Sequence, residues 1–320
     1  MLLSFIVIIL IFFFIWNFIV PFLVIKIKND QNLKSKYKNC KWALVTGGSS
    51  GIGKEICERL LAQGISVVIV SSSGNGYTNK LLEKYSKGPV RVKLITLDLS
   101  QKESCKKLIK EIEDDNQIEK ETLKLLFNNV GYLTMEAFNQ TTIEAKMEMI
   151  QCNVLTAVEL TDYFYKQLIK NKSNDSSDSN GAILFTSSIT GLCPTPFSAM
   201  YASGKSFITC FAKSLAIESR YHGIDVLVVQ PGLVNTNLFL EVPKHLIFSI
   251  LRLVGQEPSQ IVDIMFRGLG TLGFVVYNGG IFGLVSDLCC SILGINFMLN
   301  VVYYISNYLL KDFNCYKYNN

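Results

Sequence analysis

The sequence predicts an α/β fold: a doubly wound parallel sheet with an N-terminal transmembrane helix and an apolar helical C-terminal extension. Short apolar runs alternate with helical patterns from residue 42 to residue 230, as in parallel strands joined by helices. Glycine, asparagine and serine motifs follow these runs at the carboxyl ends of the expected strands, where sheets of this kind bind ligands. Residues 1–25 carry no charged side chain.

The composition fits one large core rather than a disordered or nucleic-acid-binding chain. The chain has 320 residues, of which 49% are hydrophobic and 18% charged. Its net charge of +5 arises from six lysines and one aspartate in residues 26–41, and the rest carries 25 basic and 25 acidic residues. We therefore expect no nucleic-acid partner.

The cysteines indicate a reducing compartment. There are nine, an odd number, with no Cys-x-x-Cys pair, which favours free cytosolic thiols over a disulfide framework. We expect Cys57, Cys152, Cys193 and Cys210 to be core residues.

Residues 1–25 are predicted to be a transmembrane anchor. As a helix they would extend roughly 37 Å, enough to cross a hydrocarbon core of about 30 Å. The alternatives are a secretory signal peptide, although the run lacks a basic start and a small-x-small site before Lys26, and a buried core helix. The lysines of residues 26–41, a basic juxtamembrane linker, would keep the rest of the chain in the cytosol.

Residues 42–53 read as a strand, a glycine-rich turn and the start of an amphipathic helix. Gly47, Gly51 and Gly53 allow the backbone to approach a pyrophosphate, which the free amides and dipole of the helix N-terminus would stabilise. A glycine triplet alone is also compatible with a simple tight turn, but the strand–turn–helix context favours dinucleotide binding.

The second expected strand, residues 65–70, ends in three serines where this kind of fold reads the adenosine ribose. An acidic residue there would bond the 2′-hydroxyl of NAD and repel the 2′-phosphate of NADP. Residues 71–73 offer no acid, so NADP(H) is preferred and NAD(H) is not excluded.

Three further residues suggest proton-transfer chemistry. Tyr201 and Lys205 are four apart and would share one face of a helix, where the ammonium is expected to lower the phenol pKa from about 10. Ser188 lies at the end of an apolar run, with its hydroxyl free to bond a substrate oxygen. The chain has only two histidines, so a Ser-His triad is poorly supplied and no metal site is expected.

These motifs together resemble the short-chain dehydrogenase/reductase family, whose hallmark is Tyr-x-x-x-Lys with a serine about thirteen residues earlier. Tyr-x-x-x-Lys alone is more often only a partly buried ring beside a solvated amine. Here Thr-Gly-x-x-x-Gly-Ile-Gly at residues 46–53 is similar to the family's glycine fingerprint, and Asn-Asn-Val-Gly at residues 128–131 is similar to its Asn-Asn-Ala-Gly turn. The resemblance implies a Rossmann-like sheet.

The resemblance also implies residue roles. The catalytic residues would be Asn153, Ser188, Tyr201 and Lys205. Asn153 matches the asparagine whose backbone holds a water between the lysine and solvent, although a helix residue bonding its own backbone is the alternative. The cofactor-binding residues would be Thr46, Gly47, Ser49, Ser50, Gly51, Ile52, Gly53, Ser72, Asp98, Leu99, Asn128, Tyr201, Lys205, Pro231, Gly232 and Thr236. Gly204 stands where the family usually has Ser or Thr. A glycine in the middle of a helix destabilises it by about 1 kcal/mol relative to alanine. We expect the missing side chain to relieve crowding against the cofactor.

Beyond the dinucleotide-binding catalytic domain, residues 42–236, the resemblance thins. Residues 237–267 are expected to cover the substrate, and their apolar character suggests a greasy one. Residues 268–320 form an apolar segment in which Asp287 is the single charge before residue 311, which suggests membrane-dipping helices or, alternatively, an interior helix pair or dimer face.

Within the family the chain resembles the membrane-anchored 3-oxoacyl-CoA reductase and 17-beta-hydroxysteroid dehydrogenase branch, and also the 3-ketosphinganine reductases. These similarities imply hydride transfer between NADP(H) and the carbonyl or hydroxyl of a lipophilic substrate, at the endoplasmic reticulum membrane with the catalytic domain facing the cytosol. A homodimer is left open. The alternative function is a membrane scaffold that keeps the fold but has lost catalysis.

Overall fold

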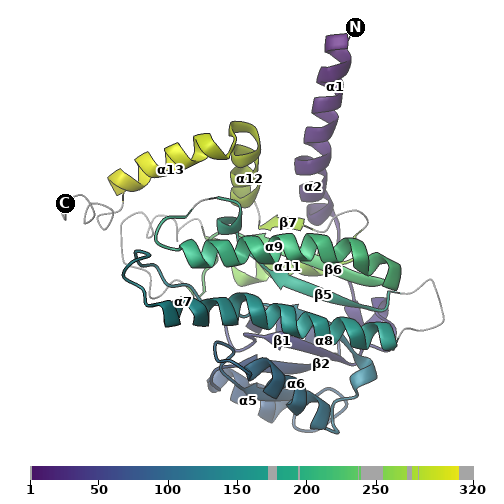
Figure 1. Ribbon diagram of the computed structural model, residues 1–320. Helices are drawn as coiled ribbons and strands as arrows, with labels where there is room; N and C mark the ends of the chain where they lie inside the picture. Colours follow the sequence, from purple (N-terminus) through teal and green to yellow (C-terminus); the bar gives the residue numbers. More distant parts are fainter. Residues whose placement is uncertain are drawn as a thin grey trace.

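In the computed structural model, seven parallel strands form one sheet in the order β3-β2-β1-β4-β5-β6-β7 (Figure 1). The structure describes residues 2–171, 179–193, 195–236, 238, 255–271, 276–279 and 281–309. The strands are β1 (Trp42–Thr46), β2 (Ser66–Ser71), β3 (Val92–Thr96), β4 (Leu123–Asn128), β5 (Gly181–Thr186), β6 (Ile224–Pro231) and β7 (Val276–Gly279). The chain reverses direction across the sheet between β1 and β4, so the predicted Rossmann-like sheet is confirmed.

Helices cover both faces of this sheet because successive strand residues point to opposite sides. Ala43 and Val45 of β1 belong to one core, whereas Trp42 and Leu44 belong to the other. The first core is covered by α3 (Leu33–Lys36), α4 (Gly51–Ala62), α5 (Gly76–Lys84) and α11 (Pro258–Gly268). The second is covered by α6 (Ser104–Asp114), α8 (Thr156–Lys170) and α9 (Ala199–Ser219). The remaining described helices and helical turns are α1 (Leu2–Phe14), η1 (Ile15–Ile19), α2 (Val20–Ile27), η2 (Lys120–Thr122), α7 (Ile143–Ile150), η3 (Gln151–Leu155), η4 (Ile189–Gly191), η5 (Arg220–His222), α12 (Ile281–Leu293) and α13 (Ile295–Leu309).

The sheet continues past residue 236, where the sequence suggested that the catalytic domain ends. β7 pairs with β6 in parallel, and Val228 is opposite Val276. α11 buries Ile261, Met265 and Phe266 in the first core, at the spacing of one helix face. α11 and β7 are therefore part of the dinucleotide-binding fold. Residues 237 and 239–254 of the predicted substrate-covering segment lie outside the described residues.

Residues 28–41, expected to be part of a basic linker, dock onto the catalytic domain. Leu33 and Tyr37 are fully buried in the first core. The Tyr37 hydroxyl donates a hydrogen bond to Asp225 Oδ2 at 2.7 Å. The Gln31 side-chain amide donates to three carbonyls at the end of α11: Phe266 at 3.0 Å, Arg267 at 3.1 Å and Leu269 at 2.8 Å. A short segment thus makes many contacts that no periodic pattern in its sequence predicts.

The lysines of this segment bind protein groups. Four of them pair within the chain: Lys28 Nζ with Thr271 Oγ1 at 2.7 Å, Lys34 Nζ with the Gly64 carbonyl at 2.8 Å, Lys36 Nζ with the Leu269 carbonyl at 2.6 Å, and Lys41 Nζ with Glu119 Oε2 at 2.7 Å. These charges stabilise the docked segment.

The N-terminal region is helical from residue 2 to residue 27 but is not one regular helix. The π-helical turn η1 lies between α1 and α2, with helical backbone angles at both junctions. Pro21 at the start of α2 has no N–H to donate one turn back, which accounts for the irregular turn before it. In Figure 1 this rod rises from the side of the sheet on which α12 and α13 also lie.

Among the described residues, no single helix meets the length and hydropathy expected of a membrane span. One bent pair, Gly283–Leu293 with Ile295–Ser306, meets both by length and composition and bends by 119°. The predicted transmembrane helix over residues 1–25 is therefore not present as one regular helix.

We predict that Gln31→Ala lowers the free energy of unfolding by about 1–3 kcal/mol, because three carbonyls lose their shared donor. Denaturation of the detergent-solubilised protein measures this, and trypsin should also cleave faster within residues 26–41. Asn29→Ala, at an exposed neighbour, is the control. Equal stability of both variants would contradict the docking.

Candidate active site

The glycine-rich turn after β1 brings the backbone of α4 against the end of the strand. Gly47 has a left-handed backbone with φ of +68°, and a Cβ on Gly53 would lie 2.2 Å from the Gly47 carbonyl oxygen. Ser50, the N-cap of α4, forms no side-chain cap, and the first turn of the helix carries no acidic residue. The first amides of α4 are thus available to an anion, and the cradle fits a dinucleotide pyrophosphate.

The Thr46 hydroxyl joins the ends of β1 and β4. Its oxygen accepts hydrogen bonds from the backbone N–H groups of Asn129 and Val130, both at 3.0 Å, and it donates to the Phe127 carbonyl at 3.2 Å. The Asn129 side-chain amide donates to the Thr46 carbonyl at 3.1 Å. Thr46 therefore positions the turn after β4.

The ends of β1 to β6 surround one cavity of about 570 Å³. Fourteen of the residues predicted from the sequence line it: Gly47, Ser49, Ser50, Gly51, Ile52, Ser72, Asp98, Leu99, Ser188, Tyr201, Lys205, Pro231, Gly232 and Thr236. The glycine turn and the Ser188–Tyr201–Lys205 group thus border the same space, although up to 158 residues separate them.

Four predicted residues lie outside the lining of this cavity: Thr46, Gly53, Asn128 and Asn153. The Asn128 side chain points instead towards α8, where its amide donates to Thr161 Oγ1 at 3.1 Å. Thr46, Gly53 and Asn153 instead hold the turns that carry lining residues.

Other lining residues were not among the catalytic and cofactor-binding residues predicted from the sequence. They include Ser71, Asn129, Tyr132, Cys152 and Thr186. Asn129 and Thr186 lie at the carboxyl ends of β4 and β5, so their positions in the sequence could have identified them as lining residues. Cys152 carries no such signal, because the packing of η3 alone brings it to the cavity.

The adenosine end of the cavity is polar. Ser49 Oγ and Ser71 Oγ share a hydrogen bond at 2.7 Å. Asp98 accepts a hydrogen bond from the Ser100 backbone N–H at 2.9 Å, and this bond holds the pKa of its carboxyl below the usual value. Among the described lining residues Asp98 is the one acidic side chain and Lys205 the one basic side chain.

Of the three residues at the other end, Ser188 is the N-cap of η4, just after β5, and Tyr201 and Lys205 lie on α9. Tyr201 and Lys205 are buried on successive turns of α9, with Lys205 Nζ 5.5 Å from the centre of the Tyr201 ring. Lys205 Nζ donates to the Thr186 carbonyl at 2.8 Å, which ties α9 to the end of β5. The Ser188 hydroxyl oxygen accepts from the Thr190 backbone N–H at 3.2 Å.

The expected acidification of Tyr201 by Lys205 is not found. Burial raises the Tyr201 pKa to about 12, opposed by a hydrogen bond with Ser188. Burial lowers the Lys205 pKa to about 8, because a low-dielectric site disfavours its ammonium. Tyr201 is therefore protonated at neutral pH, as a proton donor must be.

Asn153 lies in η3, a π-helical turn of the kind often found at functional sites. Its side-chain oxygen accepts from the Tyr132 N–H at 3.0 Å, and its amide donates to the Tyr132 carbonyl at 2.9 Å. These bonds pin the segment after β4. A Cβ on Gly131 would lie 3.3 Å from Asn153 Oδ1 and 3.4 Å from Lys205 Nζ. Asn153 thus borders the lysine through Gly131, and the alternative of a side chain bonding its own backbone is not found.

Gly204 serves helix packing and is not among the residues that line the cavity. A Cβ at this position would lie 3.1 Å from Val154 Cγ2 in η3. The missing side chain lets α9 and η3 approach closely.

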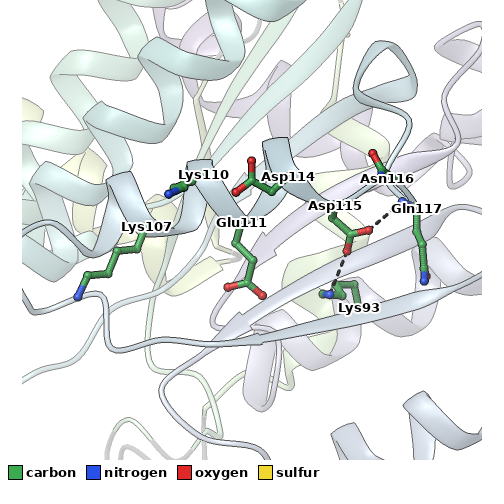
Figure 2. Close-up of a pocket in the computed structure, with 8 residues that line it drawn as sticks. All are labelled: Lys93, Lys107, Lys110, Glu111, Asp114, Asp115, Asn116 and Gln117. Atoms are coloured by element: carbon green, nitrogen blue, oxygen red, sulfur yellow. Dashed lines mark hydrogen bonds and ion pairs between the residues drawn. The ribbon is translucent and has the colours of Figure 1, made fainter.

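A second hollow lies beside the edge strand β3 and is lined by residues of β3, α6 and the loop after α6 (Figure 2). Lys93 Nζ pairs with Asp115 Oδ2 at 2.9 Å, and Asp115 also accepts from the Gln117 N–H. Three lysines and three acidic residues balance each other there.

In the part of the chain that the structure describes, no group of three or more His, Cys, Asp or Glu side chains is arranged to hold a metal.

Comparison with known proteins agrees with this site. Residues 41–246 match the family described as short chain dehydrogenase. The chain belongs to this family, whose members are NAD(P)-dependent oxidoreductases acting on C=O and CH–OH groups.

Within the family the chain is similar to very-long-chain 3-oxoacyl-CoA reductases. The enzyme of Meyerozyma guilliermondii is 29% identical over 69% of this chain and 66% of its own length. The enzyme of Candida albicans is 31% identical over 68% of this chain and 64% of its own length. The matched region spans about two thirds of these relatives.

Solved structures share the fold. A 7beta-hydroxysteroid dehydrogenase superposes with a TM-score of 0.71 at 23% identity, covering 86% of this chain and 100% of its own. ElxO with NADP bound superposes with a TM-score of 0.59 at 25% identity, covering 76% of this chain and 99% of its own.

Proposed function

We propose that the protein is a membrane-anchored reductase that uses NADP(H) to reduce the ketone of a lipophilic substrate of the 3-oxoacyl-CoA type. One observation carries the proposal: Ser188, Tyr201 and Lys205 border the same cavity as the glycine turn that fits a pyrophosphate. The similarity to very-long-chain 3-oxoacyl-CoA reductases supports this substrate class. A 3-ketosphinganine and a ketosteroid are the competing substrates.

Tyr201, Ser188 and Lys205 each have a separate role in the proposed reduction of a ketone. When bound, the nicotinamide cofactor supplies the hydride to the carbonyl carbon. Tyr201, protonated at neutral pH, donates its proton to the carbonyl oxygen, and Ser188 donates a hydrogen bond to that oxygen as negative charge develops. Lys205, held by the Thr186 carbonyl, would bind the cofactor ribose. Burial of all three excludes water from the reacting atoms.

We predict distinct kinetic effects from three substitutions. Tyr201→Phe should lower turnover by about a hundredfold or more while cofactor binding stays nearly intact, since only the proton donor is removed. Ser188→Ala should act mainly on turnover, and Lys205→Met should damage both turnover and cofactor binding. NADPH oxidation with 3-oxoacyl-CoA, 3-ketosphinganine and ketosteroid substrates measures the first quantity, and cofactor fluorescence the second.

Tyr221→Phe, at an exposed tyrosine, is the control for that series. Near-normal turnover of Tyr201→Phe would refute the proposed chemistry. If no substrate is turned over although NADPH binds, the second candidate, a catalytically inactive membrane scaffold, replaces the reductase.

The preference for NADPH rests on the serines after β2. Ser71 and Ser72 line the cavity where the adenosine ribose would lie, and neither carries a charge that repels a 2′-phosphate. NADH is the competing cofactor.

We predict that NADPH binds more tightly than NADH, and that Ser72→Asp weakens NADPH binding by at least about tenfold. Two like charges about 4 Å apart near a protein surface repel by roughly 4 kcal/mol. Titration of cofactor fluorescence decides this. Ser73→Asp is the matched control, because Ser73 does not line the cavity. Tighter binding of NADH to the unmodified protein would contradict the assignment.

We further propose that two apolar elements attach the protein to the endoplasmic reticulum membrane, with the catalytic domain in the cytosol. α1 exposes Phe5 and Phe12, η1 exposes Trp16, and α13 of the bent pair exposes Phe297 and Tyr304. Both elements extend from the same side of the sheet in Figure 1, so one lipid surface suits both.

We predict that protease added to sealed microsomes digests the catalytic domain, and that a chain lacking residues 1–25 is still partly retained in the pellet after an alkaline carbonate wash. Phe297→Asp with Ile305→Asp in that truncated chain should release it, because charges oppose lipid contact of α13. Full protection from protease would contradict the topology. Complete release of the truncated chain without these substitutions would contradict the second attachment.

A further inference from the structure

Two cysteines distant in sequence meet beside the active site. α12 packs against β7 and against η4, the turn that follows Ser188. Cys193, just after η4, and Cys290, on α12, place their Sγ atoms 2.8 Å apart although 97 positions separate them. A disulfide bond measures about 2.05 Å, so the two sulfurs need to approach by only about 0.8 Å.

Both thiols are positioned by their surroundings and are not part of the core. Cys193 and Cys290 are half-buried, and Cys210 is exposed, so the expectation of core packing holds only for Cys57 and Cys152. The Cys193 N–H donates to the Ile189 carbonyl at 3.3 Å, and its carbonyl accepts from Thr195 Oγ1 at 3.2 Å.

A cross-link between Cys193 and Cys290 would act on the stretch of chain that joins Ser188 to Tyr201. Cys193 stands between Ser188 and Tyr201 in the chain. Further along, the Phe197 carbonyl accepts from the Glu136 N–H at 2.9 Å, which ties this stretch to the segment after β4. A bond from Cys193 to Cys290 would therefore fasten α12 to the substrate side of the cavity.

We propose that Cys193 and Cys290 form a reversible redox-modification site that takes a hydroperoxide as its oxidant and locks α12 onto the substrate side of the active site. Intracellular disulfides are usually transient and redox-sensing, which fits two free thiols in this geometry. Burial and the neighbouring Cys290 raise the Cys193 pKa to about 12, so Cys193 is a poor first nucleophile and Cys290 is the thiol that reacts with the peroxide.

The chemistry balances with hydrogen peroxide as the oxidant. The Cys290 sulfur attacks a peroxide oxygen, the O–O bond breaks, and the released hydroxide takes the thiol proton, so a Cys290 sulfenic acid and one water form. The second sulfur attacks the sulfenic sulfur, the S–S bond forms, and the hydroxyl leaves with a proton as a second water. The two sulfurs together lose the two electrons that the peroxide gains, and a dithiol reductant reverses the reaction.

The test uses the full-length detergent-solubilised protein treated with hydrogen peroxide. Intact mass should fall by two hydrogens, peptide mapping should find Cys193 joined to Cys290, and dithiothreitol should restore both thiols. Cys193→Ser and Cys290→Ser should abolish the cross-link. Cys289→Ser is the matched control and should retain it, because adjacent helix residues point about 100° apart. A cross-link through Cys289, or none while the exposed Cys210 is oxidised, would overturn the proposal.

The effect of the Cys193–Cys290 disulfide on the active site can be measured by kinetics, and this test rests on the proposed reductase activity. Complete cross-linking should lower kcat/KM for a long-chain 3-oxoacyl-CoA several-fold, reversibly with dithiothreitol, and Cys290→Ser should be insensitive to peroxide. Unchanged kinetics on a fully cross-linked enzyme would contradict the lock. The mass measurement does not depend on activity, so failure of the proposed function and failure of this inference are distinguishable.

Discussion

The site depends on one constraint, that β1 and β4 end at the same edge of the sheet and in register. The Thr46 hydroxyl meets this constraint by bonding two backbone N–H groups that lie 83 and 84 residues further along the chain. A parallel sheet brings its carboxyl ends together, but it does not fix the turns that follow them. With the turn after β4 held to β1, Asn153 can pin Tyr132, and Gly131 can leave room beside Lys205. The cavity wall is thus a chain of polar contacts that starts at one threonine.

Burial determines the protonation of the two titratable residues at the active site, Lys205 and Tyr201. Lys205 is buried and its ammonium pairs with the Thr186 carbonyl rather than with a carboxylate. A buried charge without a full counter-charge is costly, and this cost appears as a lowered pKa for the lysine. The same low dielectric keeps Tyr201 protonated. Burial therefore explains both shifts, and it favours a tyrosine that donates a proton over one that rests as phenolate.

The segment before β1 couples the apolar N-terminal helices to the catalytic domain. Asp30 pairs with Arg59 of α4 and Arg267 of α11, and Tyr37 reaches Asp225 from the buried side. Individual exposed ion pairs contribute little to stability, but here they join a buried aromatic residue and several bonds to backbone carbonyls. A linker held in this way limits how the domain tilts relative to α1 and α2. Lys28, Lys34 and Lys36, three of the lysines expected to form a basic juxtamembrane linker, are used in this contact.

The sequence by itself determined the alternation of strands and helices, the glycine turn and the Ser188, Tyr201 and Lys205 group, because each rests on local periodicity or fixed spacing. Only the tertiary structure decided what depends on neighbours that are distant in the chain. It turned Asn128 towards α8, placed Gly204 against η3, and put α11 and β7 into the sheet. It also brought Cys152 to the cavity and reversed the expected pKa shift of Tyr201. Desolvation and close packing depend on every surrounding element at once, so neither can be read from spacing along one helix.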